Sequence, residues 1–432
     1  MTRTAEALLL TGAAVLAALG VTMVNLAGSG GVDARVALTF IVMALAFGTV
    51  HVAMRVLAPD STSTLLPPVA LVTAFGMIEI YRLDEYRASL QRWWLVLGAL
   101  AALAVLVWLN RIGLTALRRY RNTMFLLGVI LLALPMLPTD GPLPIRGFEA
   151  NGSRLWIVLD LGFVQLNFQP GEVAKVLFVG FLAAYLADRA PALTGARRTI
   201  GPIAIPEPRQ LAPLVLVWAA SLGVLVVQRD LGASLLLFAV FVAVLYAATG
   251  SGGYLTGGVA LALFGAIASW RLFDHVDRRV TAWLRPFSDY EDAGYQIAQG
   301  VFALGTGSLS GSGPGLGRPD LIPFAETDFI FAAIGEEFGF AGSVAVLAAY
   351  SLIVAAGFGI ALRARDPFRK LLAAGLSFAL GFQVFLIIGG VLRVVPLTGI
   401  TLPFMSYGGS SLLGNFVVIA LLARISHEEA AS

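Results

Sequence analysis

Residues 285–339, RPFSDYEDAGYQIAQGVFALGTGSLSGSGPGLGRPDLIPFAETDFIFAAIGEEFG, are a long polar stretch in a chain that otherwise consists mostly of apolar runs. Its carboxylates are Asp289, Glu291, Asp292, Asp320, Glu326, Asp328, Glu336 and Glu337. Glu336 and Glu337 fall inside the next apolar run, where a charge is costly and is usually kept for a function. A solvated loop without a task does not explain that placement, so we interpret the stretch as a functional site.

The composition places this stretch in a membrane protein. The 432 residues are 58% hydrophobic and only 13% charged, with a mean hydropathy of +0.85, far from the average of soluble domains. With no Cys and three scattered His, we expect neither a disulfide framework nor a thiolate or His-based metal centre. The sequence has no basic stripe interleaved with aromatic residues, which argues against nucleic acid as a partner.

Apolar runs long enough to cross a bilayer recur along the whole chain. They fall near 5–27, 34–58, 64–80, 93–109, 122–138, 172–188, 211–228, 231–249, 254–272, 329–361, 371–392 and 405–425. These twelve runs predict an all-α fold, a polytopic transmembrane helix bundle in which short connections join antiparallel neighbours.

Basic loops predict the orientation of this bundle. Loops 110–121, 189–210 and 362–370 each carry four basic residues and fall on the same side, which the positive-inside rule makes cytoplasmic. Both termini are then cytoplasmic, and the polar segments 139–171, 228–230, 273–328 and 393–404 lie at the outer face. The loop 81–92 runs against the rule, because Arg82, Arg87 and Arg92 are placed outside.

An extracytoplasmic site has no access to ATP, and the sequence contains no GxxxxGK[ST] phosphate-binding loop. Residues 311–317, GSGPGLG, also lack the GxGxxG spacing of a dinucleotide-binding turn. We expect them to form a flexible loop, with binding of a phosphate by their backbone N–H groups as the alternative.

Two polar constellations precede the long stretch. Glu172 and Lys175 are three residues apart and share one helical face, so they form an ion pair or bind an anionic headgroup, with snorkelling at the interface as the alternative. Trp156 fits an interfacial aromatic belt as well as a binding site. Asp230 is either the N-cap of the next span or a site residue.

Residues 326–339 supply the candidate general base. Asp328 stands where the polar stretch enters the apolar run, and Glu336 and Glu337 follow two turns deeper. Carboxylates at the edge of an apolar phase raise one another's proton affinity, as a base acting on an alcohol requires. Capping of a helix by Asp328 is the alternative, but it does not account for Glu336 and Glu337.

Prolines and glycines break the helical pattern in residues 393–411, RVVPLTGITLPFMSYGGSS. Irregular backbone at membrane depth is tolerated only where it is packed in protein or lines a polar cavity. The hydroxyls in this segment are candidates to hold a sugar or a diphosphate, with a re-entrant structural turn as the alternative. Candidate binding residues here and in the polar stretch are Arg285, Gln296, Gln299, Arg393, Thr398, Ser406 and Ser410.

These motifs, in this order, resemble the SEDS family of bacterial cell-wall polymerases, to which RodA, FtsW and SpoVE belong, and RodA-like members most. The matching pieces are NGSRLWI, FQPGEVAK, QRDLGAS, RPFSDYEDAGYQIAQG, LIPFAETDFIFAAIGEEFGFAG and VVPLTGITLPFMSYGGSS. The resemblance implies a membrane core of ten helices, here 64–432 with an extracellular loop at 273–328. It leaves two extra N-terminal helices within 1–63.

The resemblance also implies an activity. It is that of an inverting peptidoglycan glycosyltransferase in the bacterial cytoplasmic membrane, which polymerises lipid II for cell elongation and releases undecaprenyl diphosphate. The family's aspartate in the TDF motif corresponds to Asp328, which would deprotonate the acceptor sugar. Arg154, Lys175, Arg285 and Arg393 are candidates to bind the diphosphate, with a divalent cation such as Mg²⁺ or Mn²⁺ as a further candidate. The implied partner is a class B penicillin-binding protein.

Three alternatives accompany this prediction: a lipid II flippase, a septal polymerase of cell division, and a scaffold that only recruits the penicillin-binding protein. A flippase needs a polar path through the membrane, whereas the charges here gather at the outer face. The sequence departs from the family's pattern at Leu155, where members commonly carry the Arg that precedes Trp156. Arg154 lies one residue earlier and does not take that position.

Overall fold

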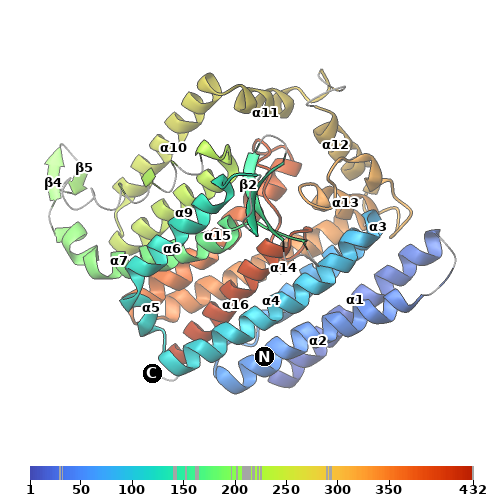
Figure 1. Cartoon of the computed structure of the whole chain (residues 1–432), viewed down its shortest axis with the longest axis horizontal. Helices are drawn as coiled ribbons and strands as arrows, with labels where there is room; N and C mark the ends of the chain where they lie inside the picture. The colour runs from blue at the N-terminus through green and yellow to red at the C-terminus, as the bar shows by residue number, and fades with distance from the viewer. Residues whose placement is uncertain are drawn as a thin grey trace. The chain divides into compact units, whose positions relative to one another are not determined.

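The structure is a computed structural model, and it describes residues 1–28, 31, 33–139, 144–150, 153–160, 165–195, 197–200, 203–206, 216, 219–220, 223, 226–288, 290 and 294–430. Helices account for most of the described residues (Figure 1). In the N-terminal half they are α1 (Arg3–Gly28), α2 (Ala34–Leu57), α3 (Leu66–Leu83), α4 (Glu85–Ile112), α5 (Thr115–Arg119), α6 (Arg121–Ala133), η1 (Leu134–Met136) and α7 (Gly171–Gly195). In the C-terminal half they are α9 (Leu231–Thr249), α10 (Gly252–Leu272), α11 (Asp274–Leu284), α12 (Tyr295–Gly307), η2 (Pro319–Leu321), α13 (Ile330–Glu337), α14 (Gly339–Arg363), α15 (Pro367–Val391) and α16 (Gly409–Ala430).

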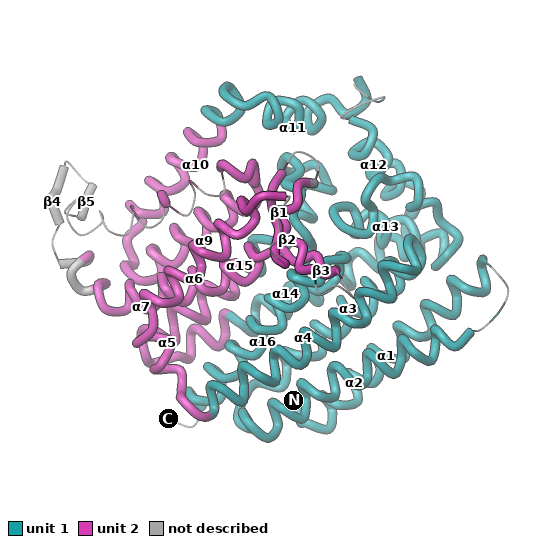
Figure 2. The backbone as a smooth tube through the Cα atoms, in the orientation of Figure 1, with its two compact units in different colours: residues 1–110, 267–357, 380–432 teal, residues 111–266, 358–379 magenta. Residues whose placement is uncertain are grey.

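The chain forms two compact units (Figure 2). Unit 1 comprises Met1–Asn110, Ile267–Gly357 and Leu380–Ser432, and unit 2 comprises Arg111–Ala266 and Phe358–Ala379. The predicted division between residues 63 and 64 does not coincide with this one, because α1 and α2 belong to unit 1 together with α3.

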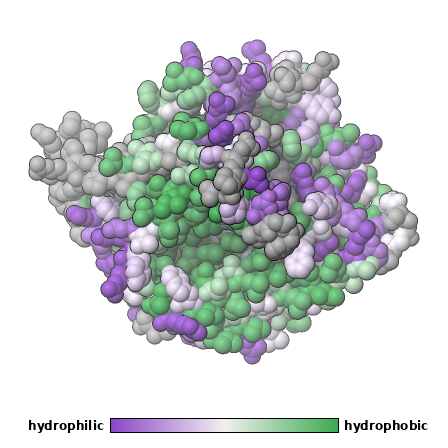
Figure 3. All heavy atoms as spheres, viewed as in Figure 1, coloured by the Kyte–Doolittle hydropathy of each residue, from purple (hydrophilic) through white to green (hydrophobic). Residues whose placement is uncertain are grey.

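Nine helices in the described part of the chain are long and apolar enough to cross a membrane, which confirms the predicted multi-span class. They are α1, α2, α3, α4, α9, α10, α14, α15 and α16. The apolar run at 172–188 forms α7, while most of the run at 211–228 lies outside the described residues. Figure 3 shows the hydrophobic side chains that these helices expose, as expected of surfaces that face lipid.

The predicted single span at 329–361 is wrong, because α13 ends at Glu337 and α14 begins at Gly339. Residues 308–311 pack into the junction, where Phe340 N–H donates to Ser308 O at 2.9 Å. Gly339 has a φ of 65°, and a Cβ on it would lie 2.3 Å from the backbone nitrogen of Gly311. Only glycine allows this approach, so the packed loop ends the helix.

A small antiparallel sheet in unit 2, which the sequence analysis did not predict, occupies part of the polar segment 139–171. Its strands β1 (Ile145–Ala150), β2 (Ser153–Asp160) and β3 (Gln165–Phe168) pair in sequence order. Ile157 lies opposite Gly147 on one side and Phe168 on the other. A second antiparallel pair is formed by β4 (Arg197–Ile200) and β5 (Ile203–Pro206).

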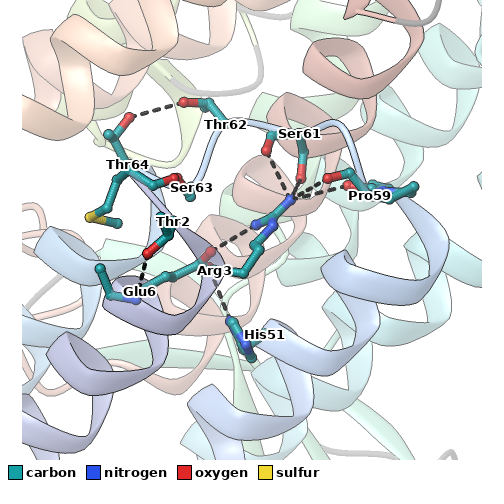
Figure 4. A network of polar contacts seen from close by, with 12 residues as sticks. Thr2, Arg3, Glu6, His51, Pro59, Ser61, Thr62, Ser63 and Thr64 are labelled. Atoms are coloured by element: carbon teal, nitrogen blue, oxygen red, sulfur yellow. Dashed lines mark hydrogen bonds and ion pairs between the residues drawn. The ribbon is translucent and has the colours of Figure 1, made fainter.

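A polar network fixes the beginning of α1 to the end of α2 (Figure 4). Arg3 donates to the Glu6 carboxylate at 2.7 Å and to the carbonyl oxygens of Pro59 and Ser61 at 2.9 and 2.8 Å. The Glu6 side chain is fully buried, and its other oxygen lies 3.3 Å from Nδ1 of His51. The helical hairpin α1–α2 is therefore held by a buried ionic contact as well as by apolar packing.

Removal of this arginine is predicted to destabilise the protein. Arg3→Ala leaves the buried Glu6 carboxylate without its main partner, and breaking a buried ion pair costs about 3–5 kcal/mol. We expect a clear fall in the thermal unfolding temperature of the full chain in detergent. Arg35→Ala is the matched control, because Arg35 pairs with exposed carboxylates and such pairs contribute little to stability. Equal losses for the two variants would contradict the prediction.

Candidate active site

Asp328 lies at the meeting point of the two motifs that the sequence singled out in 326–339 and 393–411. The Ser406 hydroxyl donates to Thr327 O at 2.5 Å and accepts from Leu402 N–H at 2.9 Å. The Tyr407 N–H donates to Glu326 O at 2.8 Å. The two residues before Asp328 are thus fixed by the PLTG…SYGGSS segment (residues 396–411). Within it, Ser406 contacts the backbone on both sides.

The Asp328 carboxylate is not used to cap α13. The N-cap residue is Phe329, whose side chain makes no capping hydrogen bond. The chain reaches Asp328 through a tight turn, in which Asp328 N–H donates to Phe324 O at 3.2 Å and Phe324 has a φ of 56°. The alternative role of Asp328 as a cap is therefore not what the structure shows.

Arg279 is the positively charged neighbour of this carboxylate, and the sequence analysis did not nominate it. It belongs to α11 and donates to Thr398 O at 3.1 Å. A Cβ built on Gly399 would lie 3.6 Å from Nη2 of Arg279 and 3.8 Å from Oδ2 of Asp328. Gly399 has a φ of 73°, so the loop passes both side chains where a residue with a side chain would be strained.

Burial and charge set the proton affinity of Asp328 in opposite directions. Burial raises the pKa of Asp328 to about 6, while the positive charge of Arg279 and a hydrogen bond from Thr327 hold it lower than burial alone would. A carboxylate with a pKa close to neutral is a better general base than an ordinary exposed aspartate.

The segment 393–411 also contains buried hydroxyl groups that lack a hydrogen-bond partner in the described part of the chain. The Oγ1 atoms of Thr398 and Thr401 are buried and have no hydrogen-bond partner among the described residues. Buried hydroxyls are normally satisfied, so these atoms are suited to bind a ligand or water. Thr398 was a predicted binding residue, and its backbone carbonyl already contacts Arg279. Ser410 is also buried, at the beginning of α16.

The predicted residues around α11 and α12 make contacts of their own. Arg393 donates from Nη2 to Trp283 O at 3.0 Å, and Trp283 Nε1–H donates back to Arg393 O at 3.0 Å, so this pair closes the end of α11. Arg285 is exposed just beyond that end. Gln296 donates to Pro323 O at 2.6 Å, and Gln299 donates to the Tyr290 hydroxyl at 2.8 Å. Asp289, Glu291 and Asp292 lie outside the described residues.

Glu336 and Glu337 accept hydrogen bonds from the glycine run (residues 311–317) and from Arg318, which follows it. The Arg318 N–H donates to Oε1 of Glu336 and the Gly315 N–H to Oε2 of Glu337, both at 2.8 Å. The N–H groups of Ser312 and Gly313 donate to the backbone carbonyls of the same two glutamates at 2.9 and 3.0 Å. These N–H groups are engaged, so the expected flexible or phosphate-binding loop is instead a segment bonded to α13.

Arginines of the predicted loop 81–92 neutralise the polar stretch. Arg82 approaches Glu337 with Nε at 3.2 Å from Oε1 and donates from Nη2 to Gly317 O at 3.0 Å. Arg87 pairs with Glu326, two residues before Asp328. The loop itself is nearly absent, because α3 ends at Leu83 and α4 begins at Glu85.

Glu79 is a further carboxylate of this region that the sequence analysis missed. It is fully buried in α3, and neither of its side-chain oxygens has a hydrogen-bond partner among the described residues. Glu337, Arg82 and Glu336 are the charged groups that act on it. An acidic residue inside the apolar run 64–80 was the available signal, since such residues are rarely retained without a function.

Glu172, Lys175 and Asp230 belong to unit 2 and lie at one end of its helices α7 and α9. Glu172 and Lys175 form the expected ion pair at 2.7 Å, and both side chains are nearly buried. Asp230 caps α9 by accepting from Ala233 N–H at 2.9 Å. Ala174 and Ala233 share one apolar cluster of α6, α7 and α9, which brings the ion pair and the cap to the same end of these helices.

Arg154 and Trp156 lie on β2, in the small sheet of unit 2. Arg154 donates to the Glu149 carboxylate at 3.1 Å across the β1–β2 hairpin, and both side chains are about half exposed. Trp156 lies opposite Phe148 on the neighbouring strand. Asn151 and Gly152 of the same motif lie outside the described residues.

The sequence of the chain is similar to those of known proteins. Residues 61–431 match the family model of the FtsW/RodA/SpoVE cell cycle proteins. The peptidoglycan glycosyltransferase RodA of Mycobacterium tuberculosis is 41% identical over 98% of this chain and 90% of its own. Stage V sporulation protein E of Bacillus subtilis is 32% identical over 66% of this chain and 74% of its own.

Solved structures agree with the sequence comparisons. A chain from a study of polymerization and crosslinking by a peptidoglycan synthase complex superimposes with a TM-score of 0.67 at 28% identity, covering 85% of this chain and 98% of its own. RodA of Thermus thermophilus gives a TM-score of 0.59 at 27% identity, covering 85% and 97%. This multi-pass membrane protein belongs to the FtsW/RodA/SpoVE family.

Proposed function

We propose that the chain is a peptidoglycan glycosyltransferase that polymerises lipid II into glycan strands. The observation that carries the proposal is Asp328, a carboxylate of raised pKa beside Arg279, fixed by the two most specific motifs of the sequence. The relatives named peptidoglycan glycosyltransferase RodA support it, since one of them is 41% identical over nearly the whole chain. Their name also supports a role in cell elongation.

The chemistry follows from what Asp328 can do. Its carboxylate accepts the proton of the acceptor 4-hydroxyl while that oxygen attacks the anomeric carbon of the growing strand. A glycosidic C–O bond forms as the bond from the anomeric carbon to the diphosphate oxygen breaks, so a single displacement inverts the anomeric centre. Undecaprenyl diphosphate leaves with the electron pair. Arg279 helps to keep Asp328 ionised before the reaction.

A divalent cation such as Mg²⁺ or Mn²⁺ is a further candidate to bind the leaving diphosphate. Among the described residues, no three His, Asp or Glu side chains come together as a ligand set. Mg²⁺ is usually held by only one or two carboxylates, with water and substrate phosphates completing its coordination. A divalent cation would have to be held mainly by the substrate diphosphate, and we assign no step to it.

The proposed topology places the site at the outer face of the cytoplasmic membrane, with both termini in the cytoplasm. The basic loops support this orientation through the positive-inside rule. The proposed partner is a class B penicillin-binding protein, which would supply crosslinking. Its support is the similarity to a chain from a peptidoglycan synthase complex.

Two other functions are separable by experiment. A flippase would move lipid II across vesicles without forming polymer, whereas the polymerase forms strands on a gel. A septal polymerase would act at the division site, and depletion of the protein would then give filaments instead of rounded cells.

Loss of the base is predicted to abolish most polymerisation. Asp328→Asn removes the proton acceptor and should lower the rate of lipid II polymerisation about 10²- to 10⁴-fold. Thermal stability should not fall, because burial already disfavours the charge that is removed. Asp274→Asn, the same change at an exposed position of α11, is the control. An active Asp328→Asn variant would show that another group is the base.

The rate is predicted to depend on pH through Asp328. Only the ionised carboxylate accepts a proton, so kcat/KM should rise with pH through about 6 and level off above it. Initial rates with labelled lipid II between pH 5 and 8 measure this profile. A flat profile through that range would exclude Asp328 as the titrating base.

Arg279 is predicted to set the position of that profile. Arg279→Gln removes the positive charge that opposes the effect of burial, so the pKa of Asp328 rises and the acid limb moves to higher pH. Arg279→Lys retains a charge and should keep the limb nearer to its original position. A purely structural role of Arg279 would change the maximal rate and leave the limb in place.

A further inference from the structure

The helices α1 and α2 lie outside the residues that match the family model, which begin at 61. They are nevertheless part of unit 1, where α1 packs along α3. A Cβ built on Gly20 would lie 2.3 Å from Cδ1 of Ile78, so the two helices are in close contact there. The Tyr81 hydroxyl donates to Oδ1 of Asn25 at 2.7 Å near the end of both helices.

The end of α1 also contacts the glycine run directly. A Cβ on Gly315 would lie 2.9 Å from Cβ of Ala27 and 3.0 Å from Cα of Val24. Contacts to real Cβ atoms are essentially never that short, so the loop lies against the surface of α1 at a residue without a side chain. Gly315 also has a φ of 83°, which favours glycine.

The glycine run connects the end of α1 to the C-terminal end of α13. The same Gly315 donates its N–H to the buried Glu337 carboxylate, and the N–H of Arg318, three residues later, donates to Glu336. Arg82 adds a second connection from α3, because it contacts both Glu337 and the carbonyl of Gly317. The C-terminal end of α13 is thus held from two sides, by α3 and by the loop that rests on α1.

A second path runs through α3 to the segment beside the base. A Cβ on Gly76 would lie 2.2 Å from the carbonyl oxygen of Met405, the residue before Ser406. Ser406 in turn bonds to Thr327 O. The face of α3 opposite to the contact with α1 is therefore packed against the PLTG…SYGGSS segment.

We propose that the hairpin α1–α2 is a positioning element that holds residues 311–318 against Glu336 and Glu337, and so fixes α13, which begins directly after Asp328 and Phe329. Gly315 is the positioning residue at the contact. The expected effect on the rate of polymerisation rests on the proposed function. The structural connection between the hairpin and α13 does not.

Two glycines of the loop provide a matched pair for the test. Gly313 and Gly315 both have a positive φ, so an alanine at either position carries similar backbone strain. A Cβ on Gly313 meets only the Leu316 side chain, at 3.3 Å, whereas a Cβ on Gly315 meets α1. The difference between Gly313→Ala and Gly315→Ala therefore isolates the contact with the hairpin.

The measurement is hydrogen–deuterium exchange of the full chain in detergent, without substrate. We expect Gly315→Ala to speed exchange of the amides of Ser312 and Arg318 about tenfold relative to Gly313→Ala. Addition of Ala27→Gly should restore part of the protection to Gly315→Ala and none to Gly313→Ala. Tyr81→Phe, which keeps the ring and removes the bond to Asn25, should speed exchange at the same amides, and it remains informative if Gly315→Ala fails to fold.

Equal exchange in the two alanine variants, or unchanged exchange in Tyr81→Phe, would overturn the proposal. Polymerisation of labelled lipid II is measured in parallel, and its rate should fall further in Gly315→Ala than in Gly313→Ala. An inactive wild-type chain with the expected exchange pattern would refute the proposed function and leave the positioning role intact. Unequal exchange with equal rates would confine the role of the hairpin to the loop and refute its effect on the base.

Discussion

The structure of the active region depends on hydrogen-bond and ion-pair donors for its buried carboxylates. Glu336 and Glu337 are buried at the end of α13, and an unpaired charge in such a place costs several kcal/mol. Their donors are Arg82 and backbone N–H groups of the glycine run. Because those N–H groups belong to the short segment 315–318, this segment has to lie along the C-terminal end of α13. Asp328 is placed by the same arrangement, since it stands at the other end of α13.

Arginines that contradict the positive-inside rule have a structural reason to be where they are. Arg82 and Arg87 follow the apolar run of α3 and pair with Glu337 and Glu326 of the polar stretch. The rule describes basic residues in loops, where they are solvated. These two lie in the helices α3 and α4 and are committed to carboxylates of their own unit, so they do not weaken the proposed orientation.

The sequence predicted some residues of this site and not others, because only some of them belong to a recognisable motif. Asp328 and Ser406 could be predicted to converge, because each stands at the beginning of an apolar run on the same predicted side, and the structure joins them through Thr327 O. Arg279 left no such signal, since it lies on a short helix without a recognisable motif. The partners of Glu337 depend on the backbone at Gly339, whose positive φ ends α13, and on which N–H groups the following packing presents.

Three of the four cations nominated for the diphosphate are already engaged within the chain, and Arg285 is exposed. Lys175 pairs with Glu172, Arg154 with Glu149, and Arg393 with the carbonyl of Trp283. An exposed pair such as Arg154–Glu149 contributes about 1 kcal/mol or less and is readily exchanged for a phosphate. A nearly buried pair such as Lys175–Glu172 is costly to break, because its carboxylate would be left without its lysine. Binding of the anion by Lys175 would therefore require Glu172 to gain another donor or a proton, whereas Arg154 can release its partner without such compensation.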